Sequence, residues 1–237
     1  GIYIYLSHDL PTTEDVRNVE LQVPLKIFTS DGKLIGEYGE IHRTKLNFNE
    51  IPENLINAFL AAEDSDFFTH TGVDFLSLLR ATYQYIKEGE IISGGGTITM
   101  QVARNYVLTK DQTFERKLKE IFMAFKLDLS FTKEEIFELY VNQIFLGNRA
   151  YGVAAASEIY YGKGLSELSI AQSAMIASLP KAPSRINPIA NPKRALIRRN
   201  WVLSRMESLG YIDEGNFLQA FNEPISAFFN GIGSEVE

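Results

Sequence analysis

The sequence predicts a mainly α-helical domain that carries a short β-hairpin near its N-terminus. Beyond Ile51, apolar residues recur at intervals of three and four, which is the spacing of an amphipathic helix. Residues that cap helices stand at the ends of these runs. In 25–38, two apolar runs flank Asp31-Gly32, and both turn residues tolerate the positive φ of a tight hairpin. A chain of 237 residues with 45% hydrophobic content can bury a substantial core.

Start and stop signals place the helices along the chain. Thr132 with Glu135, and Ser169 with Gln172, have the spacing of capping boxes. The expected helices begin at Pro52, Asp74, Thr97, Thr113, Thr132, Ser169, Asn191 and Asp213. Four of them are expected to end at Gly89, Gly147, Pro180 and Gly210.

Composition excludes several classes of function. The net charge of −7 argues against a non-specific nucleic-acid binder, because the phosphate backbone favours a basic surface. The absence of cysteine removes disulfides and thiolate metal sites. The three histidines show no metal-ligand spacing.

Glu63 closes an apolar helical run in the stretch "FLAAEDSDFFTHTGVD", residues 59–74. It follows Phe59 by four residues and Leu60 by three, so it shares their helix face and is expected on the buried stripe. Desolvation there would raise its pKa and suit a general acid or base. The alternative is a frayed helix end with Glu63 and Asp64 in water, which this helix alone favours.

A glycine-rich turn precedes Thr97 in "SGGGTITMQVARN", residues 93–105. Such a turn at a helix N-terminus can present backbone N–H groups to an anion, although the Lys-Ser/Thr ending of a nucleotide P-loop is missing. Taken alone, the glycines are more typical of a mobile loop. The polar residues that follow fit either a lined cleft or a solvated face, and they are Thr99, Gln101, Arg104 and Asn105.

The expected helix 113–129 carries an apolar stripe beside a charged cluster. The stripe consists of Phe114, Leu118, Ile121, Phe122, Phe125 and Leu129. Arg116, Lys117 and Glu120 flank it, and Ala124 leaves room there for a ligand to approach. The charges form either an ordinary set of surface salt bridges, which the spacing favours, or a diphosphate site in which Glu120 manages the sugar or a metal.

Five stretches in this order resemble the motifs of the peptidoglycan glycosyltransferases, which occur in class A penicillin-binding proteins and in monofunctional cell-wall glycosyltransferases. They are "EDSDFFTHTG" (63–72), "GGTITMQ" (95–101), "RKLKEIFMA" (116–124), "KEEIFELYVN" (133–142) and "RRNWVL" (198–203). The similarity runs from about residue 40 to 225. Gly96 and Met100 depart from the second motif, so contacts by these two side chains are not carried over.

The resemblance implies a lysozyme-like, two-lobed helical fold and an enzyme that polymerises lipid II. Glu63 is then the general base. Glu120 is a second catalytic residue, which either holds a divalent cation (Mg or Mn) on the diphosphate or contacts the sugar. The implied substrate-binding residues are Asp64, His70, Thr97, Thr99, Gln101, Arg104, Asn105, Arg116, Lys117, Asn142 and Arg198.

The resemblance also implies an organisation and a set of partners. We expect 1–45 to be a lead-in with the hairpin and the remnant of a membrane anchor, 46–230 the glycosyltransferase domain, and 231–237 a tail leading to a removed C-terminal domain. The expected partners are lipid II, the growing glycan, moenomycin-type inhibitors and the lipid interface, which part of 85–113 would enter. The expected location is the inner membrane, with the domain on its periplasmic face.

Two other functions fit parts of the pattern. A lysozyme-like glycoside hydrolase or lytic transglycosylase also relies on one helix-borne Glu, but it expels an uncharged sugar and has little use for Arg116 and Lys117 beside Glu120. A non-catalytic envelope module that docks a partner or a lipid would tolerate the loss of Glu63.

Overall fold

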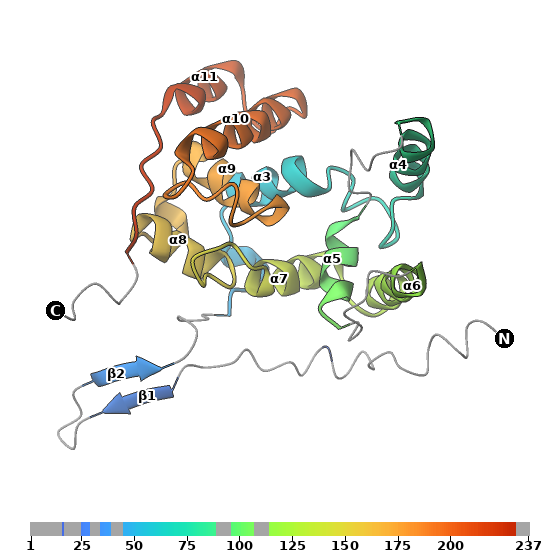
Figure 1. The fold of residues 1–237 in the computed structure, drawn as a ribbon, viewed down its shortest axis with the longest axis horizontal. Coiled ribbons are helices and arrows are strands. Elements are labelled where there is room, and N and C mark those ends of the chain that lie inside the picture. The colour runs from blue at the N-terminus through green and yellow to red at the C-terminus, as the bar shows by residue number, and fades with distance from the viewer. Residues whose placement is uncertain are drawn as a thin grey trace. The chain divides into compact units, whose positions relative to one another are not determined.

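The computed structural model describes Val16, 25–28, 34–38, 45–88, 96–106 and 114–230. These parts are almost entirely helical, which confirms the mainly α-helical prediction (Figure 1). The predicted hairpin is present as strand β1 (Leu25–Phe28) paired antiparallel with β2 (Leu34–Tyr38). Its expected turn at Asp31-Gly32 and the predicted tail 231–237 lie outside the described residues.

The chain divides into two compact units, as a two-lobed fold requires. The first comprises 1–20 and 63–140, and the second comprises 21–62 and 141–237. The helices of the first unit are α4 (Phe75–Glu88), α5 (Ile98–Arg104), α6 (Phe114–Ser130) and most of α7 (Lys133–Gln143). Those of the second are most of α3 (Glu53–Glu63), α8 (Val153–Tyr161), α9 (Ile170–Ser178), α10 (Pro192–Ser208) and α11 (Glu214–Asn222). Three short 3-10 helices complete the second unit at Phe48–Glu50, Leu165–Glu167 and Leu179–Lys181.

In the first unit, α5 packs against α6, and the buried face of α6 differs from the predicted one. Its buried residues include Glu120, Met123, Ala124 and Leu127, which are spaced by three and four. In the described part of the predicted apolar stripe, Leu118, Ile121, Phe122 and Phe125 are half-buried and Leu129 is 88% exposed. That prediction was wrong because hydrophobicity alone cannot rank two stripes when the buried one contains a compensated charge.

Gly72 brings the loop before α4 against α6. Its φ is +77°, and a Cβ there would lie 2.7 Å from the backbone oxygen of Ala124, a distance that no side chain tolerates. Ala124 itself is fully buried. The group that approaches Ala124 is therefore the chain at Gly72, and the prediction of room for a ligand at this position is wrong.

The second unit is built around α9, whose residues 171–178 are all buried. It packs against α10, α11 and α8. The predicted capping box is present, since Ser169 Oγ accepts the N–H of Gln172 at 3.1 Å. After α11 the chain runs back past α8 (Figure 1), where the N–H of Phe228 donates to the carbonyl of Tyr160 at 3.0 Å.

Two helix predictions in the second half of the chain need correction. Helix α7 ends at Gln143 rather than at Gly147, because the chain enters a small hairpin between Ile144 and Gly152. Helix α8 was not predicted. Its ends could have been inferred from Gly152 and Gly162, which flank it in the sequence. Gly162 has the left-handed φ of 61° that is typical of a residue just after a helix.

Candidate active site

Glu63 is the last residue of α3 and is half-buried. Phe59 and Leu60, on the same helix face, are buried as predicted, so the carboxylate lies where the buried stripe opens to solvent. The side-chain amide of Gln101 donates a hydrogen bond to Glu63 Oε2 at 2.9 Å. This bond orients the carboxylate and leaves it accessible, which is the arrangement that a base acting on a bound hydroxyl needs.

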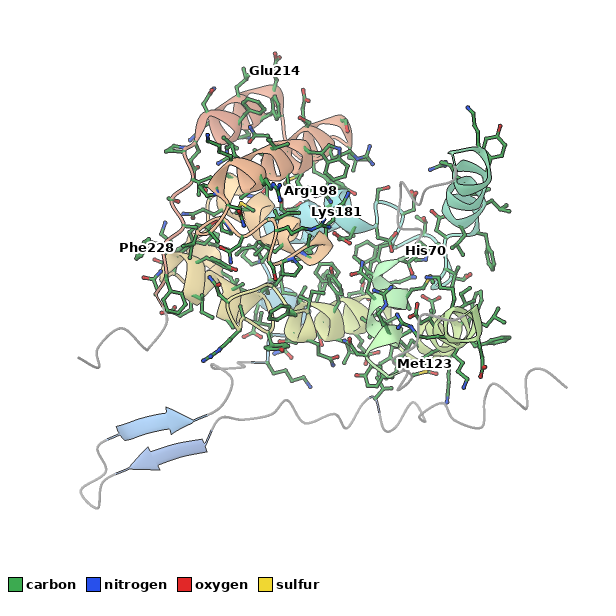
Figure 2. All side chains as sticks on the ribbon, in the orientation of Figure 1. His70, Met123, Lys181, Arg198, Glu214 and Phe228 are labelled. Carbon is green, nitrogen blue, oxygen red and sulfur yellow. The ribbon has the colours of Figure 1, made fainter. Side chains whose placement is uncertain are left out.

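Asp64 is more buried than Glu63 and binds other parts of the protein. His70 Nε2 lies 3.1 Å and 3.0 Å from its two carboxylate oxygens, and the N–H of Ile98 donates to Oδ2 at 2.9 Å (Figure 2 labels His70). Asp64 and His70 therefore join the loop after α3 to the start of α5. Both side chains act on the shape of the site.

At the start of α5, the backbone N–H groups of Ile98 and Met100 donate to side chains of the protein. Thr97 Oγ1 accepts the N–H of Met100 at 3.1 Å and donates to the carbonyl of Gly72 at 2.6 Å. The N–H of Ile98 is taken by Asp64. These two backbone N–H groups are therefore not available to an anion, which argues against the anion-binding alternative at this helix start.

Lys133, at the start of α7, binds the loop after α3 through His70 and Phe67. Its Nζ donates to the carbonyl of His70 and to Asp128 Oδ1, both at 2.6 Å, and lies 5.0 Å from the ring centre of Phe67. Sequence reasoning included Lys133 in a motif without giving it a role. The available signal was its position four residues before Phe137, which packs against the same Phe67 ring.

Glu120 is surrounded by three cationic side chains. Arg116 Nε and Arg104 Nε lie 3.0 Å and 3.4 Å from its Oε1, and Lys117 Nζ lies 3.5 Å from its Oε2. The carboxylate side chain is only 2% exposed, whereas Arg104 is 51% and Lys117 39% exposed. The structure thus brings these four predicted residues together, with the negative charge inside and two of the positive charges facing water.

The protonation of Lys117 depends on this setting. Partial burial lowers the pKa of Lys117 below its ordinary value. Glu120 opposes that shift, while the charges of Arg104 and Arg116 add to it. The ammonium remains next to Glu120 and within reach of an anionic ligand.

The cluster around Glu120 does not fit a divalent cation. Its carboxylate oxygens are already within 3.0–3.5 Å of three positive groups, which would repel a metal ion. In the described parts of the chain, no group of three or more His, Asp or Glu side chains is arranged to hold a metal. The cluster is suited to binding an anion.

One helix connects the two acidic centres. Helix α5 supplies Gln101 to Glu63 and Arg104 to Glu120. These two residues are three positions apart, so their side chains leave the same face of α5 within about one turn.

Tyr140 is a further buried group near the first centre. Burial raises the pKa of its hydroxyl well above the ordinary value, and the negative charges of Glu63 and Asp64 raise it further. The hydroxyl therefore stays neutral beside the two carboxylates. Sequence reasoning missed Tyr140, although it shares a helix face with Lys133 and Phe137.

Four other predicted substrate-binding residues are placed differently. Thr99 is fully buried, and Asn105 is exposed just after α5. In the second unit, the buried side chain of Asn142 accepts a hydrogen bond from the N–H of Leu46 and donates one to its carbonyl, both at 2.9 Å. Arg198, labelled in Figure 2, donates to the carbonyl of Ala62 at 3.4 Å and lies 3.9 Å from the ring centre of Trp201. The positions of Thr99 and Asn142 favour packing over contact with a substrate.

Comparison with known proteins agrees with these features. The profile of the Transglycosylase family matches residues 31–207. Penicillin-binding protein 1A of Pseudomonas aeruginosa is 54% identical over 230 residues, which are 97% of this chain and 28% of that protein. Penicillin-binding protein 1A of Escherichia coli is 44% identical over 97% of this chain and 27% of its own length.

A solved structure is also similar. The crystal structure of penicillin-binding protein 1A from Haemophilus influenzae matches with a TM-score of 0.51 and 36% identity, over 89% of this chain and 22% of that one. The chain thus spans less than a third of the length of these relatives. The profile match covers most of the chain, and the chain belongs to the transglycosylase family, the peptidoglycan glycosyltransferase domains of class A penicillin-binding proteins.

Proposed function

We propose that this domain polymerises lipid II into glycan strands by an inverting glycosyl transfer. Glu63 takes the proton of the GlcNAc 4-hydroxyl of lipid II while that oxygen attacks C1 of the muramyl sugar at the end of the growing chain. The bond from C1 to the diphosphate breaks, and undecaprenyl diphosphate leaves. The accessible, amide-oriented carboxylate at the end of α3 supports this role.

The observation that carries the proposal is the pair of contacts made by α5. Gln101 holds the base, and one helical turn later Arg104 joins the cations around Glu120. Inversion requires the attacking hydroxyl and the leaving diphosphate on opposite faces of one sugar ring. A single rigid helix that carries one contact to each centre is suited to fixing both groups around that ring.

The cation cluster supports a diphosphate leaving group over an uncharged one. Arg104 and Lys117 are exposed enough to reach a bound anion, and Arg116 fixes the carboxylate that holds them. Their charges would offset the negative charge that develops as the bond to the diphosphate breaks. A glycoside hydrolase or lytic transglycosylase gains nothing from such a cluster.

We place the membrane contact of the first unit on α4 and α6. Phe75 of α4 stacks on Phe125 of α6 at 5.8 Å, which joins the two helices into one apolar surface. Its exposed members are Phe75, Leu76, Leu79, Tyr83 and Leu129. An apolar surface of this kind suits a substrate whose polyprenyl chain stays in the bilayer, at the periplasmic face of the inner membrane.

The segment predicted to enter the lipid, 85–113, is described only in part. Ile91, Ile92, Val107 and Leu108 lie outside the described residues. No helix in the parts of the chain that the structure describes combines the length and apolar character needed to cross a bilayer.

Incubation of the domain with purified lipid II tests the proposed reaction. Glycan polymer should form, and a moenomycin-type inhibitor should stop it, as expected from family membership. Finished glycan strands serve as the second substrate. Cleavage of these strands without polymerisation of lipid II would identify a hydrolase or lytic transglycosylase, and inertness of the folded domain toward both would identify a docking module.

Liposome flotation tests the membrane surface. A Leu76→Ser, Leu79→Ser variant should lose binding to vesicles, because it removes two exposed apolar side chains from α4. Ile197→Ser in α10 is the matched control, since Ile197 is just as exposed but belongs to the second unit. Equal flotation of parent, α4 variant and control would reject the assignment of this surface.

A further inference from the structure

A small hairpin between α7 and α8 has an unusual backbone. Phe145 pairs with Tyr151, and the N–H of Ala150 donates to the carbonyl of Gly147 at 2.7 Å across a four-residue turn. Both central residues of this turn have positive φ, with 46° at Asn148 and 61° at Arg149. Among the described residues they are the two non-glycine residues in this region of φ.

The second central position is the one where glycine is normally found. Turns with positive φ at both central residues favour Asn followed by Gly, because a Cβ is strained in this conformation. Asn148 matches that preference and Arg149 does not. The chain therefore keeps a long cationic side chain at a position where glycine would relieve strain.

The neighbouring residues hold the turn in this conformation. A Cβ at Gly147 would lie 2.8 Å from the hydroxyl of Tyr160, so the chain is packed closely there. Asn187 donates to the side-chain oxygen of Asn148 at 3.1 Å, and the Tyr160 hydroxyl donates to the carbonyl of Leu146 at 2.9 Å. Backbone strain that the surroundings enforce in this way is typical of functional sites.

The side chains around the turn have a consistent chemistry. Arg149 is exposed, and within the described residues its guanidinium has no hydrogen-bond or ion-pair partner. Lys181 and Arg185 are also exposed. They shortly precede Asn187, whose side chain donates a hydrogen bond to Asn148 in the turn. Phe145, 39% exposed, packs on Tyr151 with ring centres 5.0 Å apart. The hairpin thus offers positive charge and an aromatic surface close together along the chain.

We propose that this hairpin is a binding subsite for the glycan strand, separate from the residues that carry out the reaction. Sugar rings of the strand pack on Phe145 and Tyr151, and Arg149 pairs with a carboxylate of a peptide stem. The inference rests on the proposed function, because it assumes that a long, acidic sugar polymer is the ligand. A strand many sugars long extends beyond the reacting pair, and contacts with its remote part supply binding energy that holds it between successive transfers.

The test compares the parent chain with Arg149→Gly. Glycine relieves the strained φ, so the melting temperature should rise or stay unchanged, while the affinity for purified glycan strands with intact stems should fall about tenfold, the effect of losing one charge-assisted contact. Arg149→Lys should recover part of the affinity. Arg194→Ala, which removes an exposed arginine from α10, is the control and should bind as the parent does.

Two further ligands test whether Arg149 binds the peptide stems, the sugar chain or an anionic lipid surface. Strands whose peptide stems have been removed should bind parent and Arg149→Gly equally. Vesicles of anionic phospholipid should show no dependence on Arg149. Equal binding of stem-bearing strands to both proteins, a lower melting temperature of Arg149→Gly, or a loss confined to vesicle binding would each overturn the proposal.

Polymerisation of lipid II by the parent is measured in parallel. A parent that makes no polymer contradicts the proposed function. A parent that polymerises normally, with an Arg149→Gly variant that binds strands equally well, contradicts only the subsite.

Discussion

Glu63 and Glu120 are two carboxylates of the first unit that contact the same helix, α5, in very different surroundings. Glu63 is half-buried and accepts a hydrogen bond from a neutral amide, Gln101. Glu120 is buried and lies within 3.0–3.5 Å of three cationic groups. A proton acceptor must be reachable by its substrate. Glu63 is the more exposed of the two carboxylates, since the side chain of Glu120 is only 2% exposed.

The difference also explains why Glu120 is a carboxylate. Three cationic side chains at the end of α5 and the start of α6 would repel one another without a negative charge between them. Glu120 supplies that charge from the buried side and leaves Arg104 and Lys117 facing solvent. We therefore propose that Glu63 takes the proton and that Glu120 positions the cations.

The largest effect is expected for Glu63→Gln. Glutamine keeps the shape of the side chain and cannot accept the proton, so the rate of lipid II polymerisation should fall by about 10²–10⁴-fold with an unchanged melting temperature. Glu53→Gln, at the exposed start of the same helix, is the control and should keep the parental rate. A folded Glu63→Gln enzyme with near-parental activity would falsify the assignment of the base.

Lys117→Ala should have the next largest effect. It removes one of the exposed cations next to Glu120, and the loss of a charged group that stabilises a leaving group costs about 10²–10³-fold in rate. The melting temperature should change little, because Lys117 is partly in water. Lys126→Ala on the same helix serves as the control. If Lys117→Ala polymerises lipid II at the parental rate, the cluster does not act on the diphosphate.

Glu120→Gln should lower stability as well as rate. The cations lose their buried counter-charge, and we expect a loss of about 1–3 kcal/mol in the free energy of unfolding, less than for a fully buried pair because Arg104 and Lys117 can turn to water. The rate should fall about tenfold as the cations move apart. Denaturant unfolding and initial rates measure both quantities.

The control for that experiment is Glu115→Gln, which removes the half-exposed partner of Lys119 on the same helix. It should cost less stability than Glu120→Gln, because the Glu115 side chain is 51% exposed and that of Glu120 only 2%. A Glu120→Gln variant with parental stability and a rate as low as that of Glu63→Gln would instead make Glu120 a direct participant in the reaction.

The smallest effect concerns pH. Burial lowers the pKa of Lys117, and its positive form is the one that offsets the diphosphate charge. The rate should therefore fall as pH rises through this lowered pKa, earlier than an ordinary lysine would cause. Lys117→Arg should move that decline to higher pH, because arginine keeps its charge. The rate is measured from neutral to alkaline pH for both proteins. If the rates of parent and Lys117→Arg fall at the same pH, a group other than Lys117 causes the decline.

Local sequence signals predicted most helix starts and the buried residues that share a helix face with Glu63. The capping box of Thr132 is present, with the N–H of Glu135 donating to Thr132 Oγ1 at 3.2 Å and the N–H of Thr132 donating to Glu135 Oε2 at 2.8 Å. The placement of Glu63 after two buried residues of α3 followed from helical spacing. Such features depend on residues three or four apart and need no knowledge of the rest of the chain.

The buried face of α6 could not be predicted in this way. Two stripes of similar spacing compete on that helix, and the one with Glu120 is buried because Arg104, sixteen positions earlier, helps to compensate its charge. Helical spacing placed Lys133 and Tyr140 on one face with Phe137, but their roles depend on contacts with distant segments. Lys133 binds the carbonyl of His70, 63 positions away, and no local pattern encodes that contact.

The sequence by itself therefore determined the helical class, most helix starts, the family and the residues that gather in the two acidic centres. Only the tertiary structure decided which carboxylate is accessible, which is enclosed by cations, and which helix connects them. Helical spacing specifies the face of a helix on which a side chain lies. Whether that face meets solvent, a cation or an apolar neighbour depends on segments that are distant in the sequence, and that environment sets the chemistry of a carboxylate.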